Sequence, residues 1–158
     1  MASPEPGRAL PGGSYHFDDL AVGDRWSTGG LVVTEWHILT FAGLSGDFFD
    51  VHMDDAFARK LGFDGKIAHG ILGLALVDGL KNRADVRLVA VASLGWTWEF
   101  RGPIQPGDRI HAEIAILHLR PTKRADRGIA RLGFRVLNQR DELVQEGENR
   151  LMMRRREG

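Results

Sequence analysis

The sequence of 158 residues contains no cysteine. This absence excludes disulfide bonds, thiolate metal ligands and a cysteine nucleophile, and it suits an intracellular protein. An excess of charge of one sign is lacking as well, because Lys and Arg together number 21, as do Asp and Glu. A formal net charge of zero gives no indication of nucleic acid or of an anionic membrane as a partner.

Long hydrophobic runs are also missing. The longest apolar run covers residues 71–77, whereas a membrane-spanning helix needs roughly 20 residues. The first 14 residues contain three prolines and lack the apolar stretch of a signal peptide, so we expect a disordered arm over residues 1–14. The remaining residues, 15–158, fit one globular domain by length and composition. We therefore expect a cytoplasmic protein.

Two short helices are predicted in the first half of the chain. Thr34 is a suitable N-cap, and the apolar residues after it are spaced by three and four, which predicts a helix of about ten residues. The glycine-containing region 43–46 supplies a stop, so residues 47–51 are expected in irregular backbone. Asp54 then caps a second short helix that ends at Gly62.

A longer helix is predicted over residues 67–80. This segment is apolar on all sides apart from His69 and Asp78, which favours a buried helix. Its glycines cost about 1 kcal/mol each in helix propensity against alanine, so we expect a neighbour that approaches the backbone closely. Asp78 is expected to reach the exposed side of the helix or to line the floor of a pocket, and we favour the exposed side because an unpaired buried carboxylate is costly. The glycines are Gly70, Gly73 and Gly79.

From Val86 onward the apolar pattern changes to a period of two, which indicates strands with one buried face. Four strands are predicted, separated by turn-forming sequences, and a shorter strand is expected near residues 26–33. Consecutive antiparallel strands that wrap around one buried helix define the α+β class. The open edge of such a sheet favours a homodimer or a higher homo-oligomer. The inward residues are Leu94, Trp96, Trp98 and Phe100, then Ile110, Ala112, Ile114 and Ile116, then Ala130, Leu132, Phe134 and Val136, and last the weaker segment 143–153.

Asp47 and His52 form a candidate proton-transfer pair. On a regular helix their five-residue offset turns the two side chains about 140° apart, so they converge only where the backbone is irregular. The expected loop over 47–51 meets that condition. From the spacing alone, a loop carboxylate and a loop histidine without a catalytic role are the more frequent case.

Several segments together resemble the MaoC-like dehydratases, a family that includes the (R)-specific enoyl-CoA hydratases. They are FDDLAVGDRW, FAGLSGDFFDVHMDDAFARKLGF, KIAHGIL, FRGPIQPGD and RVLNQRDELV, and they cover nearly the whole chain from Phe17 onward. The family's hydratase core usually reads Gly-Asp-x-Asn-Pro-x-His. Gly46, Asp47 and His52 match this core, while Phe49 and Asp50 stand where Asn and Pro are usual. The resemblance implies the hot-dog fold.

The resemblance further implies a hydro-lyase that adds water reversibly to a trans-2-enoyl-CoA thioester and gives the (R)-3-hydroxyacyl-CoA. This reaction needs a directed water, a base, an acid and stabilisation of the enolate oxygen. Asp47 and His52 would hold the water, and because such a pair titrates as a unit, neither is assigned as the base. Gly70, in the AHG motif, would place the helix start at the oxyanion. No cofactor is expected, since coenzyme A is part of the substrate.

Three further residues are expected at the substrate: Phe49, Ala68 and His69. Phe49 would shape the acyl site, although it and Phe48 are most simply read as core or dimer packing. His69 would contact substrate, although a histidine just before a helix is more often a cap or a packed polar residue. No metal is expected, because no second histidine has a helical ligand spacing with His52.

Two other functions are compatible with the same residues, and the residues that would bind the phosphates of coenzyme A are not fixed by the sequence. An acyl-CoA thioesterase is possible on the same fold. An acyl-CoA binding module without turnover is suggested by Phe49 and Asp50 at their unusual positions. The phosphates of coenzyme A call for basic residues at the pocket mouth, although charged turns are usually just solvated. The candidates are Lys66, Lys123, Arg124 and Arg127.

Overall fold

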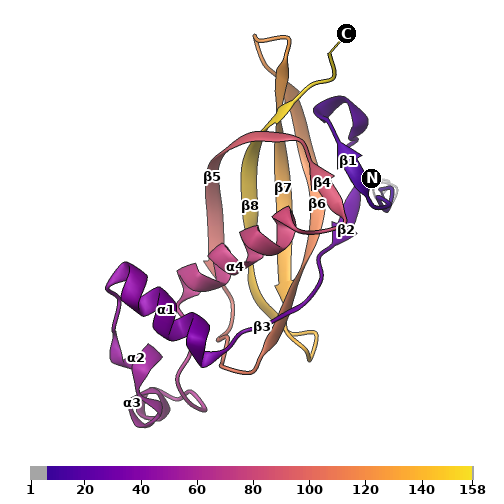
Figure 1. Ribbon diagram of the computed structural model, residues 1–158. Helices are drawn as coiled ribbons and strands as arrows, with labels where there is room; N and C mark the ends of the chain where they lie inside the picture. The colour runs from indigo at the N-terminus through magenta and orange to yellow at the C-terminus, as the bar shows by residue number, and fades with distance from the viewer. Residues whose placement is uncertain (1–6, 158) are drawn as a thin grey trace, which may run out of the picture.

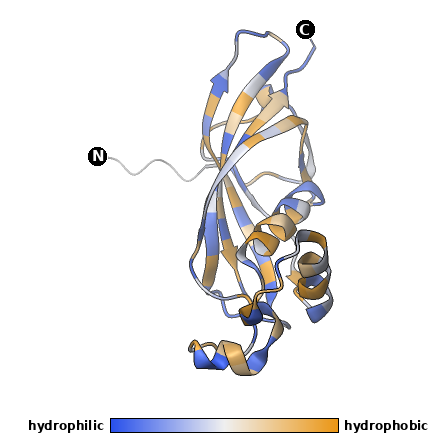
Figure 2. Ribbon diagram, turned by 90° about the vertical axis from the view of Figure 1, so that its left-hand side faces the viewer, coloured by the Kyte–Doolittle hydropathy of each residue, from blue (hydrophilic) through white to orange (hydrophobic). Residues whose placement is uncertain are grey.

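A computed structural model describes residues 7–157 as a twisted antiparallel sheet with the helices on one side (Figures 1 and 2). The strand order is β2-β6-β7-β8-β5, and β3 also pairs with β6. The four long strands confirm the predicted meander, and the predicted short strand appears as two strands. The inward expectation is wrong for Leu94 and Phe100, which are 37% and 57% exposed. The strands are β2 (Arg25–Ser27), β3 (Leu31–Val32), β5 (Ala90–Phe100), β6 (Arg109–Pro121), β7 (Arg127–Leu137) and β8 (Leu143–Arg154).

The alternating residues of β6 and β7 form part of the core under the central helix. Ile110, Ile114 and Leu132 are at most 1% exposed, so their side chains are removed from water as the period of two predicts. The alternation of β8 is weaker in sequence because two of its inward positions hold amides instead of apolar groups. These are Gln145 and Asn149, both buried.

The central helix α4 (Gly70–Asn82) lies across the inner face of the sheet (Figure 1). It begins at residue 70 and not at 67, because residues 67 and 68 are not helical and their amides bond to the main-chain oxygens of Val51 and Ile104. The expected close neighbour exists at Gly70, where an added Cβ would lie 2.6 Å from the Phe100 ring. A Cβ at Gly73 would overlap the Gln145 amide. At Gly79 the expectation is wrong, since nothing lies within 4 Å.

Asp78 reaches the exposed side of α4, as we favoured, instead of a pocket floor. Its side chain is 39% exposed and accepts a hydrogen bond from Lys81 at 2.6 Å. Lys81 itself is buried and its Nζ lies 5.5 Å from the Trp96 ring centroid. The carboxylate is therefore paired with a cation that spans the last turn of the helix.

Residues 7–14 correct the expectation of a disordered arm. Leu10 is 8% exposed, and its amide bonds to the main chain of Arg25 at 2.9 Å. Strand β1 (Gly13–Tyr15) pairs in parallel with β4 (Val86–Leu88). Apolar burial and main-chain pairing together fix this segment, which its prolines had concealed. Residues 1–6 lie outside the described part of the chain.

Helices α1, α2 and α3 lie together at one end of the sheet (Figure 1). Helix α1 (Glu35–Ser45) begins after Thr34 and ends at Gly46, which has a φ of 80°, as predicted. Asp54 caps α3 (Asp55–Lys60) and accepts from the amide of Ala56 at 2.7 Å. The loop over 47–51 is shorter than expected, because α2 (Asp50–Met53) already contains two of its residues.

Among residues 7–157, no helix is both long enough and apolar enough to cross a bilayer.

Candidate active site

The carboxylate of Asp47 sits on the irregular segment between α1 and α2. Its Oδ1 accepts a hydrogen bond from the amide of Phe49 at 3.2 Å, and its own amide bonds to Ser45 Oγ at 3.2 Å. Both contacts are local turns in which a side chain bonds two residues along the chain. Because α1 stops at Gly46, the carboxylate is directed back over the turn that leads to His52.

His52 lies on α2 and is fixed by its Nδ1, which is 2.8 Å from the main-chain oxygen of Ile67. A carbonyl only accepts, so Nδ1 carries the proton and the lone pair is on Nε2. Burial lowers the pKa of His52, and the nearby His69 lowers it further, while the bond to Ile67 and the charge of Asp47 oppose this only in part. His52 is thus held as a neutral imidazole with one basic nitrogen.

His69 stacks on His52 with ring centroids 3.9 Å apart and is 3% exposed. Its Nε2 donates to the main-chain oxygen of Asp47 at 2.9 Å, and Phe41 packs on it at 4.9 Å between ring centroids. His69 therefore connects the start of α4 to the Asp47 turn. In the structure its side chain holds the Asp47 turn by a bond to the main chain, and although His69 occupies the N-cap position of α4 it makes no side-chain bond to the helix amides.

Asp47, His52 and His69 converge in space. Their carboxylate and ring-nitrogen atoms all lie within 4.8 Å of one another. The two histidines have no helical spacing in the sequence, and the turn before α4 brings them together instead. Both His52 Nδ1 and His69 Nε2 already donate to main-chain oxygens, which leaves His52 Nε2 and the buried Nδ1 of His69 as the two imidazole nitrogens without a partner. A carboxylate beside a free imidazole nitrogen is suited to proton transfer through a water.

Phe49 and Asp50, which stand where Asn and Pro are usual, are compatible with the start of a helix. Asp50 is the first residue of α2, a position that proline favours because the amide there needs no helical partner; aspartate is favoured in the same first turn. Phe49 takes the N-cap position without a side-chain bond, and its ring packs edge-on against His52 at 6.2 Å and Phe57 at 5.8 Å. Phe49 is also 56% exposed, so it borders the pair from the solvent side.

The start of α4 adjoins this pair directly. The first helical bond runs from the Gly73 amide to the His69 oxygen at 3.2 Å, which leaves the amides of Gly70 and Ile71 without helical acceptors. Ala68 is 6% exposed and its amide bonds to Ile104 at 2.7 Å, so its main chain fixes the approach to the helix. Unpaired amides at the end of a 13-residue helix can stabilise a developing negative charge.

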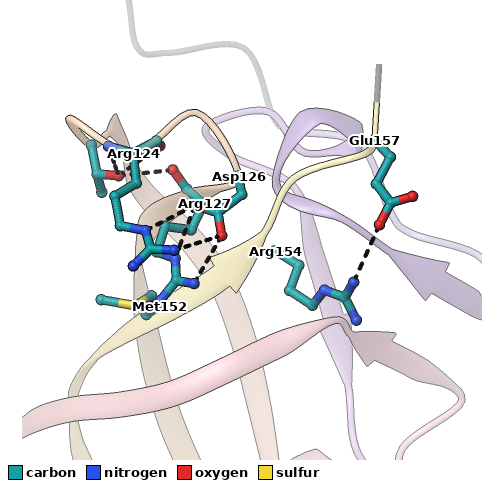
Figure 3. Close-up of polar contacts among 7 residues, drawn as sticks. Arg124, Asp126, Arg127, Met152, Arg154 and Glu157 are labelled. Atoms are coloured by element: carbon teal, nitrogen blue, oxygen red, sulfur yellow. Dashed lines mark hydrogen bonds and ion pairs between the residues drawn. The ribbon is translucent and has the colours of Figure 1, made fainter.

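Of the four candidate phosphate-binding residues, only Lys66 lies beside the pair, where its Nζ is 2.7 Å from Glu35. The other three lie at the far end of the sheet, two in the β6–β7 turn and Arg127 as the first residue of β7 (Figures 1 and 3). There Arg127 and Arg124 bond to Asp126 at 2.8 and 3.2 Å and hold the pKa of that carboxyl well below its usual range. These cations therefore do not reach the pair of the same chain.

Comparison with known proteins identifies the group to which this chain belongs. The sequence matches the family described as MaoC like domain over residues 21–133, more than half of the chain. The chain belongs to the MaoC-like hydratase and dehydratase family. This MaoC-like chain is 35% identical over 113 residues to the (R)-specific enoyl-CoA hydratase of Aeromonas caviae, which covers 70% of this chain and 79% of the relative.

Solved structures agree with the fold of the MaoC-like chain. The MaoC-like dehydratase from Rhodospirillum rubrum gives a TM-score of 0.81 at 32% identity and covers 91% of this chain and 99% of that one. A Mycobacterium tuberculosis protein with a double hotdog fold gives 0.81 at 21% identity and covers 94% of this chain and 48% of that one. The expected hot-dog fold and the family resemblance are confirmed. Membership places the chain among enzymes of the hydro-lyase class.

Proposed function

We propose that this protein adds water reversibly to a trans-2-enoyl-CoA thioester and forms the (R)-3-hydroxyacyl-CoA. The observation that carries the proposal is the convergence of the Asp47 carboxylate with the ring of His52, whose Nε2 is free, next to the start of α4 and its unpaired amides. The names of relatives, such as the enoyl-CoA hydratase of Aeromonas caviae, support the same reaction and its (R) product.

In the proposed reaction, Asp47 and His52 hold one water between them and direct it at C3. The pair takes a proton from the water and returns one to C2, so the proton balance closes without any other reagent. The enolate oxygen forms against the amides of the α4 start. Acid–base chemistry of this kind needs no metal and no cofactor beyond the coenzyme A of the substrate.

Phe49 and His69 take different places in this proposal. Phe49 borders the pair from the solvent side and contacts the acyl chain near C3. His69 is almost fully buried behind His52, so it positions the Asp47 turn and the helix start. Ala68 contributes its backbone at the approach to Gly70.

A homodimer forms part of the proposal. Strand β5 pairs with β8 alone in the sheet of residues 7–157, so the other edge of its 11 residues is open. Val91 and Leu94 on this strand are 44% and 37% exposed, and exposed edges with apolar residues are typical pairing sites. Exposed apolar residues also gather around the catalytic loop, which a second copy would cover. They are Trp36, Leu39, Leu44, Phe48 and Phe49.

The assay that tests the function follows the conjugated absorbance of crotonyl-CoA and of longer enoyl-CoA thioesters. We expect the absorbance to fall on addition of the protein, with the (R)-3-hydroxyacyl-CoA as product by chiral analysis. Release of coenzyme A thiol from a saturated acyl-CoA, without any loss of enoyl absorbance, would instead identify a thioesterase. Calorimetric binding without turnover of any enoyl chain would identify a binding module. A cytoplasmic location is proposed together with this substrate.

A further inference from the structure

A buried amide that the catalytic pair does not use holds the first turn of α4. Gln145 occupies an inward position of β8 and is 2% exposed. Its Nε2 donates to the Gly70 carbonyl at 3.0 Å, and its Oε1 accepts from Trp98 Nε1 at 3.0 Å. The side chain therefore joins β5, β8 and α4 at the residue where the helix begins.

The chemistry of both partners fixes the orientation of this amide. An indole N–H can only donate and a main-chain carbonyl can only accept, so the oxygen of Gln145 must face Trp98 and its nitrogen must face Gly70. A flipped amide would lose both bonds in a buried place, where an unmade bond costs the most. Gly73 leaves room for the amide, since a Cβ there would overlap it. The contact is thus specific to a carboxamide.

The bond to Gly70 acts on the peptide unit that also contains the amide of Ile71. In a trans peptide the carbonyl and the N–H point in opposite directions, so fixing one fixes the other. The Ile71 amide has no helical acceptor, because the first helical bond starts at Gly73. A hydrogen bond accepted by the carbonyl also polarises the N–H of the same peptide. The Gln145 bond therefore directs and strengthens one of the free donors at the helix start.

We propose that Gln145, supported by Trp98, is a positioning residue for the oxyanion-binding amides at the start of α4. The inference rests on the proposed hydration function and deepens it. Gln145 never contacts the substrate. It holds the peptide between Gly70 and Ile71 so that its N–H already faces the enolate oxygen when charge develops there, and no reorganisation is needed in the transition state.

The kinetic test compares three variants with the wild-type protein. Gln145→Leu removes both bonds, and Gln145→Glu keeps an acceptor for Trp98 but loses the donor to Gly70. For both we expect kcat to fall about 10- to 100-fold with KM changed less than about threefold, since the support of an oxyanion donor acts mainly in the transition state. Trp98→Phe keeps the donor on Gln145, so its kcat is expected to fall less than in either Gln145 variant.

A spectroscopic test reports oxyanion stabilisation without turnover. Acetoacetyl-CoA ionises to an enolate that absorbs in the ultraviolet, and stabilising amides lower the pH at which the bound ligand ionises. We expect the ionisation midpoint of the bound ligand to be lower on the wild-type protein than in free solution. In both Gln145 variants we expect this midpoint to rise, by about one pH unit or more, toward the value in free solution. A lower global stability would not change the ionisation of a ligand on folded protein.

Asn149→Leu is the matched control. Asn149 is also a buried amide of β8, but it donates to Ser93 Oγ at 2.7 Å and to the Gly95 carbonyl at 3.0 Å, both on β5. We expect this variant to lower the melting temperature while kcat and the enolate midpoint stay at wild-type values.

The outcomes separate the two proposals. Folded Gln145 variants with wild-type kcat and wild-type enolate midpoint would overturn the positioning role alone, and so would equal losses in Asn149→Leu. A wild-type protein that hydrates no enoyl-CoA, yet shows a lowered enolate midpoint that depends on Gln145, would overturn the hydration function and support the positioning role. If Gln145→Leu does not fold, Gln145→Glu and Trp98→Phe decide by the same criteria.

Discussion

At the scale of single residues, His52 and His69 make different contacts with the Asp47 turn. His52 keeps one nitrogen free beside the Asp47 carboxylate, while His69 uses its Nε2 to hold the main chain of Asp47. The two rings stack, so any change of charge on one is felt by the other. The proposed proton transfer and the positioning of the Asp47 turn therefore involve two neighbouring imidazoles.

Removal of either member of the pair is expected to abolish hydration. Asp47→Asn keeps the size of the side chain and His52→Ala removes the free Nε2. Each should lower kcat for crotonyl-CoA by about 100- to 10,000-fold, because general acid–base groups contribute that much. Circular dichroism checks that the fold is intact. Wild-type rates in both folded variants would refute the assignment of the pair.

The pH dependence follows from the lowered pKa of His52. Because burial lowers this pKa below the ordinary value of 6.5, the imidazole stays neutral at pH values where an exposed histidine is protonated. The acidic limb of the kcat/KM profile of crotonyl-CoA hydration is therefore expected below pH 6.5. An acidic limb above that value would contradict the expected neutral state.

The same shift links pH to stability. The folded state binds the His52 proton at a lower pH than the unfolded chain does, so the contribution of the neutral ring is present above pH 6.5 and is lost as pH falls through the folded pKa. Urea midpoints between pH 7 and pH 5 measure this loss. We expect a smaller loss in His52→Gln, which cannot take up the proton.

At the scale of elements, the N-terminal segment 7–15 is packed against the rest of the domain and is not a loose arm. Leu10 packs into the core, and Arg8 bonds to the buried Asp24 at 2.8 Å. Strand β1 pairs in parallel with β4, and β4 is followed directly by β5. The segment thus supports the strand that carries Trp98 toward the helix start.

Leu10→Ala tests this packing. We expect the free energy of unfolding to fall by about 2 kcal/mol or more, the lower range for a buried leucine, because the core loses apolar contacts. Urea denaturation measures the change. Leu61→Ala serves as the control, since Leu61 is 55% exposed and should change stability by less than about 0.5 kcal/mol. Equal effects at the two sites would show that the segment is not packed.

At the scale of the whole molecule, the open edge of β5 connects assembly with the site. The strand ends at Phe100, whose ring lies against Gly70, so its far end reaches the start of α4. A second copy that pairs along β5 would therefore lie near the start of α4 in the first. The strand that carries the proposed dimer interface therefore also contacts the helix start that carries the proposed oxyanion site.

Charges on that edge are expected to separate the copies. Val91→Lys with Leu94→Lys puts two cations on the open edge, a device that blocks strand pairing. Analytical ultracentrifugation should show a dimer for the wild-type protein and a monomer for the variant. Val22→Lys, at a residue that is 61% exposed outside β5, should remain dimeric. A dimer in the β5 variant would place the interface elsewhere.

The sequence by itself determined the ends of α1 and α3, the four long strands and the turn that carries Asp47. Caps at Thr34 and Asp54, the stop at Gly46 and the period of two after Val86 act over a few residues, so local chemistry suffices to predict them. The close approach to Gly70 and Gly73 was likewise indicated, because glycine in a buried helix has a cost that packing must repay.

Only the tertiary structure decided which distant groups meet. His69 lies 17 positions after His52 and Gln145 lies 75 after Gly70, and neither separation carries a sequence period that could pair them. The stacked imidazoles and the buried amide behind the helix arise because a curved sheet closes on α4 and excludes water there. The ordered segment 7–14 has the same cause, since its pairing partners lie on other strands.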